Sequence, residues 1–190
     1  MAVNHSIGRL SQNPLVNILA YQFAWFACIL SAAKGLPWIG TVTALLVVAW
    51  HVSGARIPKT ELVLITAAGV IGLSWESLLV QTGWIAYPSG NMIPGLAPHW
   101  IVALWLVFAT TFNVSLKWFK KHLGVVALFG FIGGPLAFYA GSALGALTLT
   151  PELGLAAIAV GWGLLMPILM LIARRFDGIN PLSDKIINNP

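Results

Sequence analysis

The hydrophobic positions of this chain fall into six long runs separated by short polar segments. The runs cover about 14–33, 36–53, 61–84, 98–117, 123–147 and 151–174. Each has roughly the 17–25 residues that a helix needs to cross about 30 Å of hydrocarbon. The pattern predicts an all-α fold: a polytopic membrane bundle of six transmembrane helices within residues 14–174, flanked by terminal segments 1–13 and 175–190.

Composition supports a membrane protein. Hydrophobic residues make up 58% of the 190 positions and charged residues only 8%, whereas soluble domains have roughly 25% charged residues. Because the six runs use most of the chain, they leave no room for a separate soluble domain. The remaining charges concentrate at the ends of the runs, so their distribution carries information about orientation.

The basic residues sort to one side of the predicted membrane. With the exception of Lys34, every Lys and Arg lies in a terminal segment or in the loop after the second or the fourth run. Cytoplasmic loops carry an excess of Lys and Arg. We therefore expect both termini in the cytoplasm, and the same rule explains the net charge of +5 without a nucleic-acid partner.

Glu76 is the only carboxylate well inside a predicted helix. A charge at that depth costs about 3 kcal/mol or more, so an intramembrane carboxylate is a functional-site hypothesis by default. Gly69, Gly72 and Gly83 lie on the same face of helix 61–84. Small residues let a neighbouring helix approach closely, so we expect Glu76 to point into the bundle.

Polar and aromatic side chains at similar depth complete a candidate pocket in the outer half of the bundle. Its predicted residues are Glu76, Gln22, Trp25, Tyr139, His99, Gln81, Trp75 and Trp105. In one interpretation the pocket binds or translocates a small or lipid-like substrate, with or without proton uptake by Glu76. In the other, a protonated Glu76 donates to Gln22 or Tyr139 and locks the helices together. The deep tryptophans, which include Trp162, either wall an apolar pocket or fill the core.

Two further features leave alternatives open. In run 98–117 a moderately polar stripe occupies one helix face, either as a path through the bundle or as polar contacts between helices; it consists of His99, Ala103, Leu106, Thr110, Asn113 and Lys117. The outward loop at 84–98 has no charge and interleaves aromatic residues with three prolines. It is either an interfacial connector or a lid.

Recognisable catalytic and metal motifs are absent from the sequence. The four His residues are scattered, there is no phosphate-binding loop, and Cys28 has no second cysteine for a metal pair. We therefore expect no metal and no cofactor, and the sequence leans against an enzyme. There are two alternatives. One is a lipid-modifying enzyme with Glu76 as acid or base, and the other is a structural subunit of a lipid-modifying complex. The oligomeric state is not fixed by the sequence.

Three segments resemble a family of small six-span bacterial inner-membrane proteins that carry a domain of unknown function. They are residues 21–28 (YQFAWFAC), 98–105 (PHWIVALW) and 133–141 (GGPLAFYAG). The resemblance extends over about 15–172 and implies a multi-pass protein of the bacterial inner membrane. Genes of such proteins often neighbour those of lipid-modifying enzymes, which favours membrane lipids or acyl chains as partners. The family resemblance supplies no catalytic residues.

Overall fold

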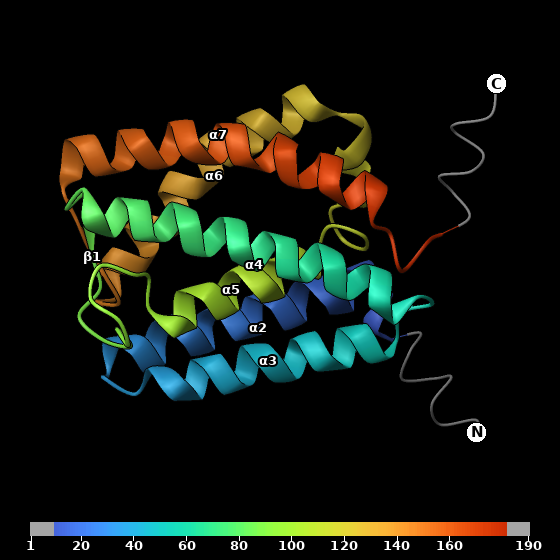
Figure 1. Ribbon diagram of the computed structural model, residues 1–190, viewed down its shortest axis with the longest axis horizontal. Coiled ribbons are helices and arrows are strands. Elements are labelled where there is room, and N and C mark those ends of the chain that lie inside the picture. The colour runs from blue at the N-terminus through green and yellow to red at the C-terminus, as the bar shows by residue number, and fades with distance from the viewer. Residues whose placement is uncertain (1–9, 182–190) are drawn as a thin grey trace.

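The computed structural model describes residues 10–181, and this part of the chain is almost entirely helical (Figure 1). Its six α-helices are α2 (Pro14–Ala33), α3 (Pro37–Ser53), α4 (Pro58–Gln81), α5 (His99–Ala109), α6 (Leu123–Ala143) and α7 (Pro151–Arg175). A short 3₁₀ helix, η1 (Lys117–Lys121), precedes α6. Strands β1 (Ile85–Ala86) and β2 (Thr148–Leu149) form a small antiparallel pair. The predicted all-α class is confirmed.

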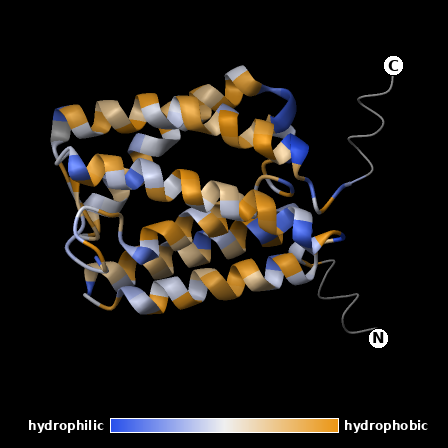
Figure 2. Cartoon of the chain, in the orientation of Figure 1, coloured by the Kyte–Doolittle hydropathy of each residue, from blue (hydrophilic) through white to orange (hydrophobic). Residues whose placement is uncertain are grey.

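Four of these helices are long and apolar enough to cross a membrane. They are α2, α4, α6 and the Glu152–Arg175 part of α7, with 20 to 24 residues each. The other two are apolar but shorter, with 17 residues in α3 and 11 in α5. Figure 2 shows hydrophobic residues along the length of the helices and hydrophilic ones mainly near their ends. These helices mark the chain as a membrane protein.

Local sequence signals explain where the helices begin and end. α2, α3, α4 and α7 each begin at a proline, a residue whose fixed φ suits the first helical position and whose missing N–H is not needed there. Asn13 also caps α2 by accepting from the N–H groups of Leu15 and Val16. Gly83 follows α4 with a φ of 72°, in the left-handed region that glycine adopts readily and that commonly terminates a helix.

The helices alternate in direction and form two groups (Figure 1). Helices α2 to α5 constitute the four-helix group, in which α5 packs against α2, α3 and α4. Helices α6 and α7 constitute the second group, the α6–α7 hairpin, and pack mainly against each other. Few backbone contacts join the two groups: α4 contacts α7, and α2 has hardly any with α6, so the groups meet mainly through side chains such as Trp105 on α5 and Trp162 on α7. This leaves space between the groups for a cavity.

The fourth run does not form the single helix that its hydrophobicity predicts. α5 ends at Ala109, and residues 110–116 form turns. The hydroxyls of Thr110 and Thr111 donate to the carbonyls of Val107 and Phe108, local bonds that compete with continued helix. Non-helical backbone at membrane depth is tolerated where protein covers it, and residues 110–114 are buried. The predicted stripe from His99 to Lys117 on one helix face is therefore wrong.

Basic residues gather at one end of the bundle, which we call the basic end. It holds the first residues of α2, α4 and α6 and the last of α3 and α7 (Figure 1). Its basic residues are Arg56, Lys59, Lys117, Lys120, Lys121, Arg174 and Arg175. Among the described residues, Lys34 is the only Lys or Arg at the opposite end. The structure thus brings together in space the charges that the sequence places in separate loops.

Residues 176–181, the first part of the predicted C-terminal segment 175–190, pack against the basic end. Asp177, Gly178 and Ile179 are buried. Lys120 Nζ donates to Asp177 at 2.7 Å, and the Ile57 N–H donates to the Gly178 carbonyl at 2.9 Å. The rest of the predicted tail, and most of the predicted N-terminal segment 1–13, lie outside the described residues.

Candidate functional site

The loop between α4 and α5 turns inward at the end opposite the basic end. β1 in this loop pairs with β2, in the register Ile85 with Leu149. Ser89 donates to the Ala32 carbonyl of α2 at 2.7 Å, and Trp100 Nε1 donates to the Ser89 carbonyl at 3.1 Å. These contacts fix the loop to α2 and α5. They also bury Tyr87, whose side chain enters the bundle.

Glu76, on α4, is 0% exposed and accepts a hydrogen bond at each carboxyl oxygen. The Tyr87 hydroxyl donates to Oε2 at 2.7 Å, and Trp105 Nε1 donates to Oε1 at 3.0 Å. Burial, together with the nearby Glu76, raises the pKa of Tyr87 well above its ordinary value of 10.0, so that its hydroxyl keeps its proton. In the described part of the chain, no Lys, Arg or His is paired with Glu76.

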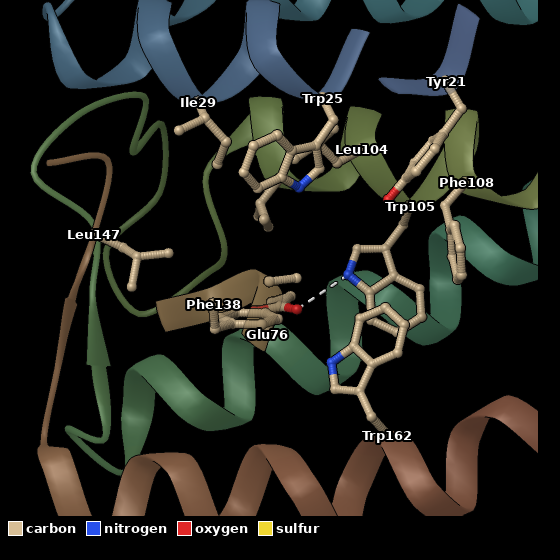
Figure 3. Close-up of a pocket in the computed structure, with 12 residues that line it drawn as sticks. Tyr21, Trp25, Ile29, Glu76, Leu104, Trp105, Phe108, Phe138, Leu147 and Trp162 are labelled. Carbon is tan, nitrogen blue, oxygen red and sulfur yellow. Dashed lines mark hydrogen bonds between the residues drawn. The ribbon is translucent and has the colours of Figure 1, made fainter. Parts of the chain in front are cut away.

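A cavity lies beside Glu76, between the four-helix group and the α6–α7 hairpin (Figure 3). The centre of a water-sized molecule can occupy about 60 Å³ within this cavity. Because one water needs about 10–15 Å³ by the same measure, the cavity has room for several waters. Apart from Glu76 and the Tyr21 hydroxyl, its walls are apolar, and half of them are aromatic. The lining residues are Tyr21, Trp25, Ile29, Glu76, Ile101, Leu104, Trp105, Phe108, Ala137, Phe138, Leu147 and Trp162.

Glycines make room for the large rings around this cavity. A Cβ at Gly72 would lie 2.2 Å from Trp105 Cγ, and one at Gly134 would lie 2.6 Å from Trp162 Cγ. The two indoles stack on each other, with centroids 4.8 Å apart and planes at 26°. The resulting series Gly72–Trp105–Trp162–Gly134 connects α4, α5, α7 and α6. The glycine face of α4 therefore accommodates a tryptophan ring of α5 at Gly72.

Trp162 also carries a hydrogen-bond donor without a partner. Its Nε1 is buried and finds no acceptor among the residues that the structure describes. A buried donor without a partner costs free energy on the order of 1–3 kcal/mol. Trp162 lines the cavity, so an occupant with an oxygen acceptor offers one way to satisfy this group.

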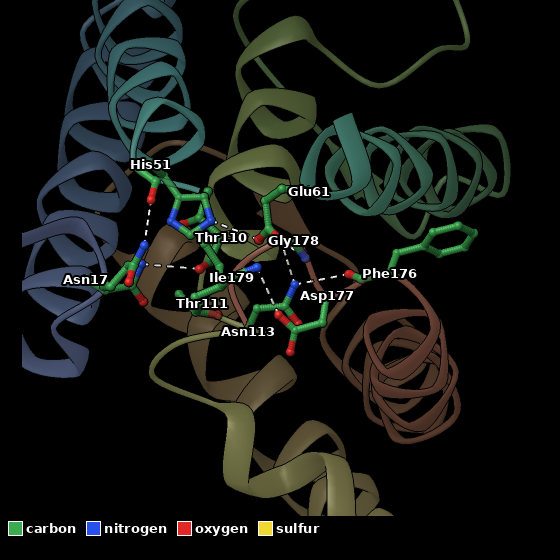
Figure 4. Close-up of polar contacts among 12 residues, drawn as sticks. Asn17, His51, Glu61, Thr110, Thr111, Asn113, Phe176, Asp177, Gly178 and Ile179 are labelled. Carbon is green, nitrogen blue, oxygen red and sulfur yellow. Dashed lines mark hydrogen bonds and ion pairs between the residues drawn. The ribbon is translucent and has the colours of Figure 1, made fainter. Parts of the chain in front are cut away.

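A second buried carboxylate, Glu61, lies at the basic end in a different environment (Figure 4). Its Oε1 is 2.9 Å from His51 Nε2, and its Oε2 accepts from Asn113 Nδ2 at 2.7 Å and from the Gly178 N–H at 3.0 Å. We call Glu61, His51, Asn113 and Gly178 the Glu61 cluster. It connects α3, α4, the turns after α5 and the segment after α7, and all four residues are buried.

The comparison with known families identifies the family of the chain. Residues 14–168 match the family described as "Protein of unknown function (DUF2878)". The chain belongs to the DUF2878 family. No curated protein and no solved structure matches the chain. The DUF2878 match contains every residue that lines the cavity, and it ends before the segment at 176–181 that supplies Gly178 to the Glu61 cluster.

The structure brings three of the predicted pocket residues of this DUF2878 protein together and leaves five apart. Glu76, Trp25 and Trp105 line the cavity. Gln22 lies on the exposed side of α2, and Tyr139 is 64% exposed on α6. Neither contacts Glu76 through a hydrogen bond, so the predicted bonds from Glu76 to Gln22 or Tyr139 are replaced by those of Tyr87 and Trp105.

The other three have separate surroundings. Trp75 lies against α7, where a Cβ at Gly161 would be 2.1 Å from its ring. Gln81 is exposed and donates to the Gly95 carbonyl at 3.1 Å. His99 Nδ1 lies 2.7 Å from the Thr41 hydroxyl, and its ring stacks on Trp38. Helical spacing alone does not reveal which side of its helix each of them faces.

Sequence reasoning missed Tyr87 and Tyr21 as site residues. Tyr87 belongs to the loop at 84–98, and only the pairing of β1 with β2 shows that this loop turns inward. Tyr21 lies beside the predicted Gln22, one position along the same helix. The described residues contain no group of three or more His, Cys, Asp or Glu side chains that could hold a metal ion.

Proposed function

We propose that this protein crosses the bacterial inner membrane six times, with both termini in the cytoplasm, and binds or translocates a small or lipid-like substrate in the cavity beside Glu76. The observation that carries the proposal is a buried carboxylate at the wall of an aromatic cavity, with no basic partner in the part of the chain that the structure describes. Ligand sites are typically apolar cavities with a small number of placed polar groups. An ionisable side chain within a membrane often marks a functional site. Glu76 is therefore a second reason to regard the cavity as a binding site.

The distribution of charge supports the orientation. The basic end gathers Lys and Arg residues from several loops, as cytoplasmic surfaces of membrane proteins do. Six crossings require that the chain from His99 to Lys121 passes from one end of the bundle to the other. α5 covers about 16 Å at 1.5 Å per residue, and the turns at 110–116 that follow it contain Asn113 of the Glu61 cluster, at the basic end.

Cysteine labelling tests this orientation. Met92→Cys places a thiol in the α4–α5 loop, where Met92 is 68% exposed, and Arg56→Cys places one in the exposed α3–α4 loop. An impermeant thiol reagent added to intact cells should label the first and not the second. The native Cys28 is buried and provides the unreactive background. The reverse pattern would contradict both the orientation and the outward position of the loop.

The position of the cavity favours a substrate that arrives from the lipid. Its walls come partly from α2 and partly from α6, two helices that hardly touch. An acyl chain or another apolar group that approaches from the lipid between them would have to displace side chains only, such as Ile29 beside Gly141. Tyr21 and Trp25 line this side of the cavity from α2, and Ala137 and Phe138 line it from α6.

The surroundings of Glu76 favour binding over acid–base catalysis. A general acid or base must come within hydrogen-bond distance of the atom that it protonates or deprotonates. Both oxygens of Glu76 already accept bonds, and the side chain is 0% exposed. Its negative charge can act on an occupant through space, and it can be neutralised by a proton when the cavity is empty.

Mass spectrometry of the purified protein tests the binding proposal. We expect a stoichiometric lipid or small molecule to co-purify with the native protein. Ala137→Phe fills part of the cavity and should remove most of it, whereas Ala143→Phe, at an exposed position on α6, should retain it. Equal amounts on the two variants would contradict the proposal. A chemically altered lipid in place of the bound one would favour the enzymatic alternative.

A further inference from the structure

We infer that the cavity takes the quaternary ammonium group of an organic cation, a class of ligand that has a positive charge and no N–H donor. This inference rests on the proposed function, because it names the chemistry of the substrate for the same cavity. Three observations lead to it: the charge of Glu76, the aromatic walls, and the lack of free acceptors.

The first observation is the unbalanced charge. When ionised, Glu76 places a negative charge at the cavity wall, and no basic side chain within the described range is paired with it. Charges interact strongly where burial lowers the local dielectric constant. A cation in the cavity would therefore be bound more tightly than a neutral molecule of the same shape. A proton on Glu76 would remove this preference.

The second observation is the aromatic wall. Tyr21, Trp25, Phe108 and Phe138 line the cavity together with the two stacked indoles. Aromatic faces attract cations through their quadrupole, and cages of such rings recognise quaternary ammonium groups. The Trp105 N–H donates to Glu76, so the negative charge acts directly on one of these rings. In Figure 3 the Trp25 ring lies across the cavity from Glu76.

The third observation decides between kinds of cation. A primary ammonium has three donors and no acceptor, and each donor needs a partner when it is buried. Glu76 is 0% exposed, so the remaining lone pairs of its two oxygens are not open to a donor in the cavity, and the rest of the lining offers only the Tyr21 hydroxyl as a side-chain oxygen. A quaternary ammonium has no donor to satisfy, and its methyl groups match apolar walls. The cavity thus fits this class and disfavours a primary amine.

The same geometry predicts competition between cation and proton. The titratable groups on the elements around Glu76 are Tyr21 and Cys28 on α2 and Tyr87 in the loop before α5. Helices α5, α6 and α7 contribute no titratable group to the lining. Glu76 is therefore the group whose protonation changes the charge of the site. Affinity for the cation should fall as the pH is lowered, and affinity for a neutral ligand should not.

Isothermal titration calorimetry of the full-length protein in lipid nanodiscs tests the inference. The probes are choline and 3,3-dimethyl-1-butanol, which has the same shape and hydroxyl group but carbon in place of the charged nitrogen. Because both can satisfy the Trp162 donor equally, the comparison isolates the charge. We expect choline to bind about tenfold more tightly than the neutral probe, because the Glu76 carboxylate and the aromatic faces both attract the cation.

Two variants test whether the difference in affinity between the probes depends on Glu76. Glu76→Gln should lose most of the tenfold difference, while Glu152→Gln, which removes an exposed acid on α7, should keep it. Thermal unfolding of each variant shows that it is folded. Nanodiscs of phosphatidylcholine or of phosphatidylglycerol distinguish the sources of the group. Weaker choline binding in phosphatidylcholine supports a lipid headgroup, and equal binding in both supports a free cation.

Three results would overturn the inference. If the neutral probe binds the native protein as tightly as choline, the cavity selects for shape and not for charge, and the proposed function remains without a cationic substrate. If neither probe binds while the co-purified molecule is neutral, the same conclusion follows. If neither probe binds and no molecule co-purifies, the binding proposal itself fails together with the inference.

Discussion

Glu61 and Glu76 lie on the same helix, α4, about 22 Å apart along its axis at 1.5 Å per residue, and both are fully buried. Glu61 accepts two N–H donors on one oxygen and lies 2.9 Å from His51 on the other. Glu76 accepts one bond on each oxygen, from the neutral side chains of Tyr87 and Trp105. Glu76 lines the cavity, and Glu61 is not among the residues that line it.

The difference separates a structural carboxylate from a candidate site. The partners of Glu61 come from three other parts of the chain, so its side chain holds the basic end together without any added group. Glu76 has no basic partner within residues 10–181, and the cavity adjoins it. Burial and hydrogen bonding alone do not identify function, because the two residues share both. The lack of a counter-charge and the cavity distinguish them.

The largest expected effect comes from removing the carboxylate of the Glu61 cluster. Glu61→Leu leaves the Asn113 amide, the Gly178 N–H and His51 without their acceptor. Breaking a buried pair in this way costs roughly 3–5 kcal/mol. Unfolding of the purified protein in detergent should show this loss, whereas Glu152→Leu, at an exposed acid, should stay within about 0.5 kcal/mol. If the two variants are equally stable, the claim that Glu61 has a structural role is contradicted.

A smaller loss should follow from overpacking beside Glu76. Gly72→Ala would place a Cβ 2.2 Å from Trp105 Cγ, so the ring must move and its bond to Glu76 must weaken. Added volume in a packed core costs about 1–3 kcal/mol. Gly133→Ala, on the open side of α6 where a Cβ meets nothing within 4 Å, should be neutral or slightly stabilising. Thermal unfolding distinguishes them, and an unaffected Gly72→Ala would show that Trp105 is not held in place.

The smallest effect is expected at Tyr87. Tyr87→Phe keeps the ring and removes the donor to Glu76 Oε2, a change worth about 1 kcal/mol or somewhat more for a charged acceptor. Tyr139→Phe removes the same hydroxyl at a position that is 64% exposed, and it should leave the unfolding free energy unchanged. If both variants behave alike, the hydroxyl of Tyr87 does not stabilise Glu76, and the site lacks one of its two donors.

The hydrophobic runs predicted most of the helices because a helix needs about 20 apolar residues to cross a membrane. The run at 14–33 coincides with α2, and the run at 123–147 continues only a few residues beyond α6. The run at 98–117 is equally apolar but ends as a helix at Ala109. Hydropathy does not report the side-chain bonds of Thr110 and Thr111 that accompany the turns. Protein packing around residues 110–114 decides the outcome there.

The candidate site was predictable at its centre and not at its edge. Glu76 stands out by depth and charge, and the deep tryptophans by residue type. Tyr139 and Gln22 share that depth but face outward, because rotation about the helix axis follows from tertiary packing. Tyr87 is eleven positions from Glu76 and reaches it only because its loop folds back over the bundle. Periodicity within one helix contains no information about such a contact.

The most direct test of the central claim is the density in the cavity when the protein's structure is determined by electron cryomicroscopy in native lipid. The account predicts density for a bound molecule against Trp25 and Phe138, beside an unpaired Glu76. It predicts none within the Glu61 cluster, whose carboxylate keeps its protein partners. A cavity closed by side chains, or a basic residue paired with Glu76, would contradict the claim that this carboxylate belongs to a ligand site.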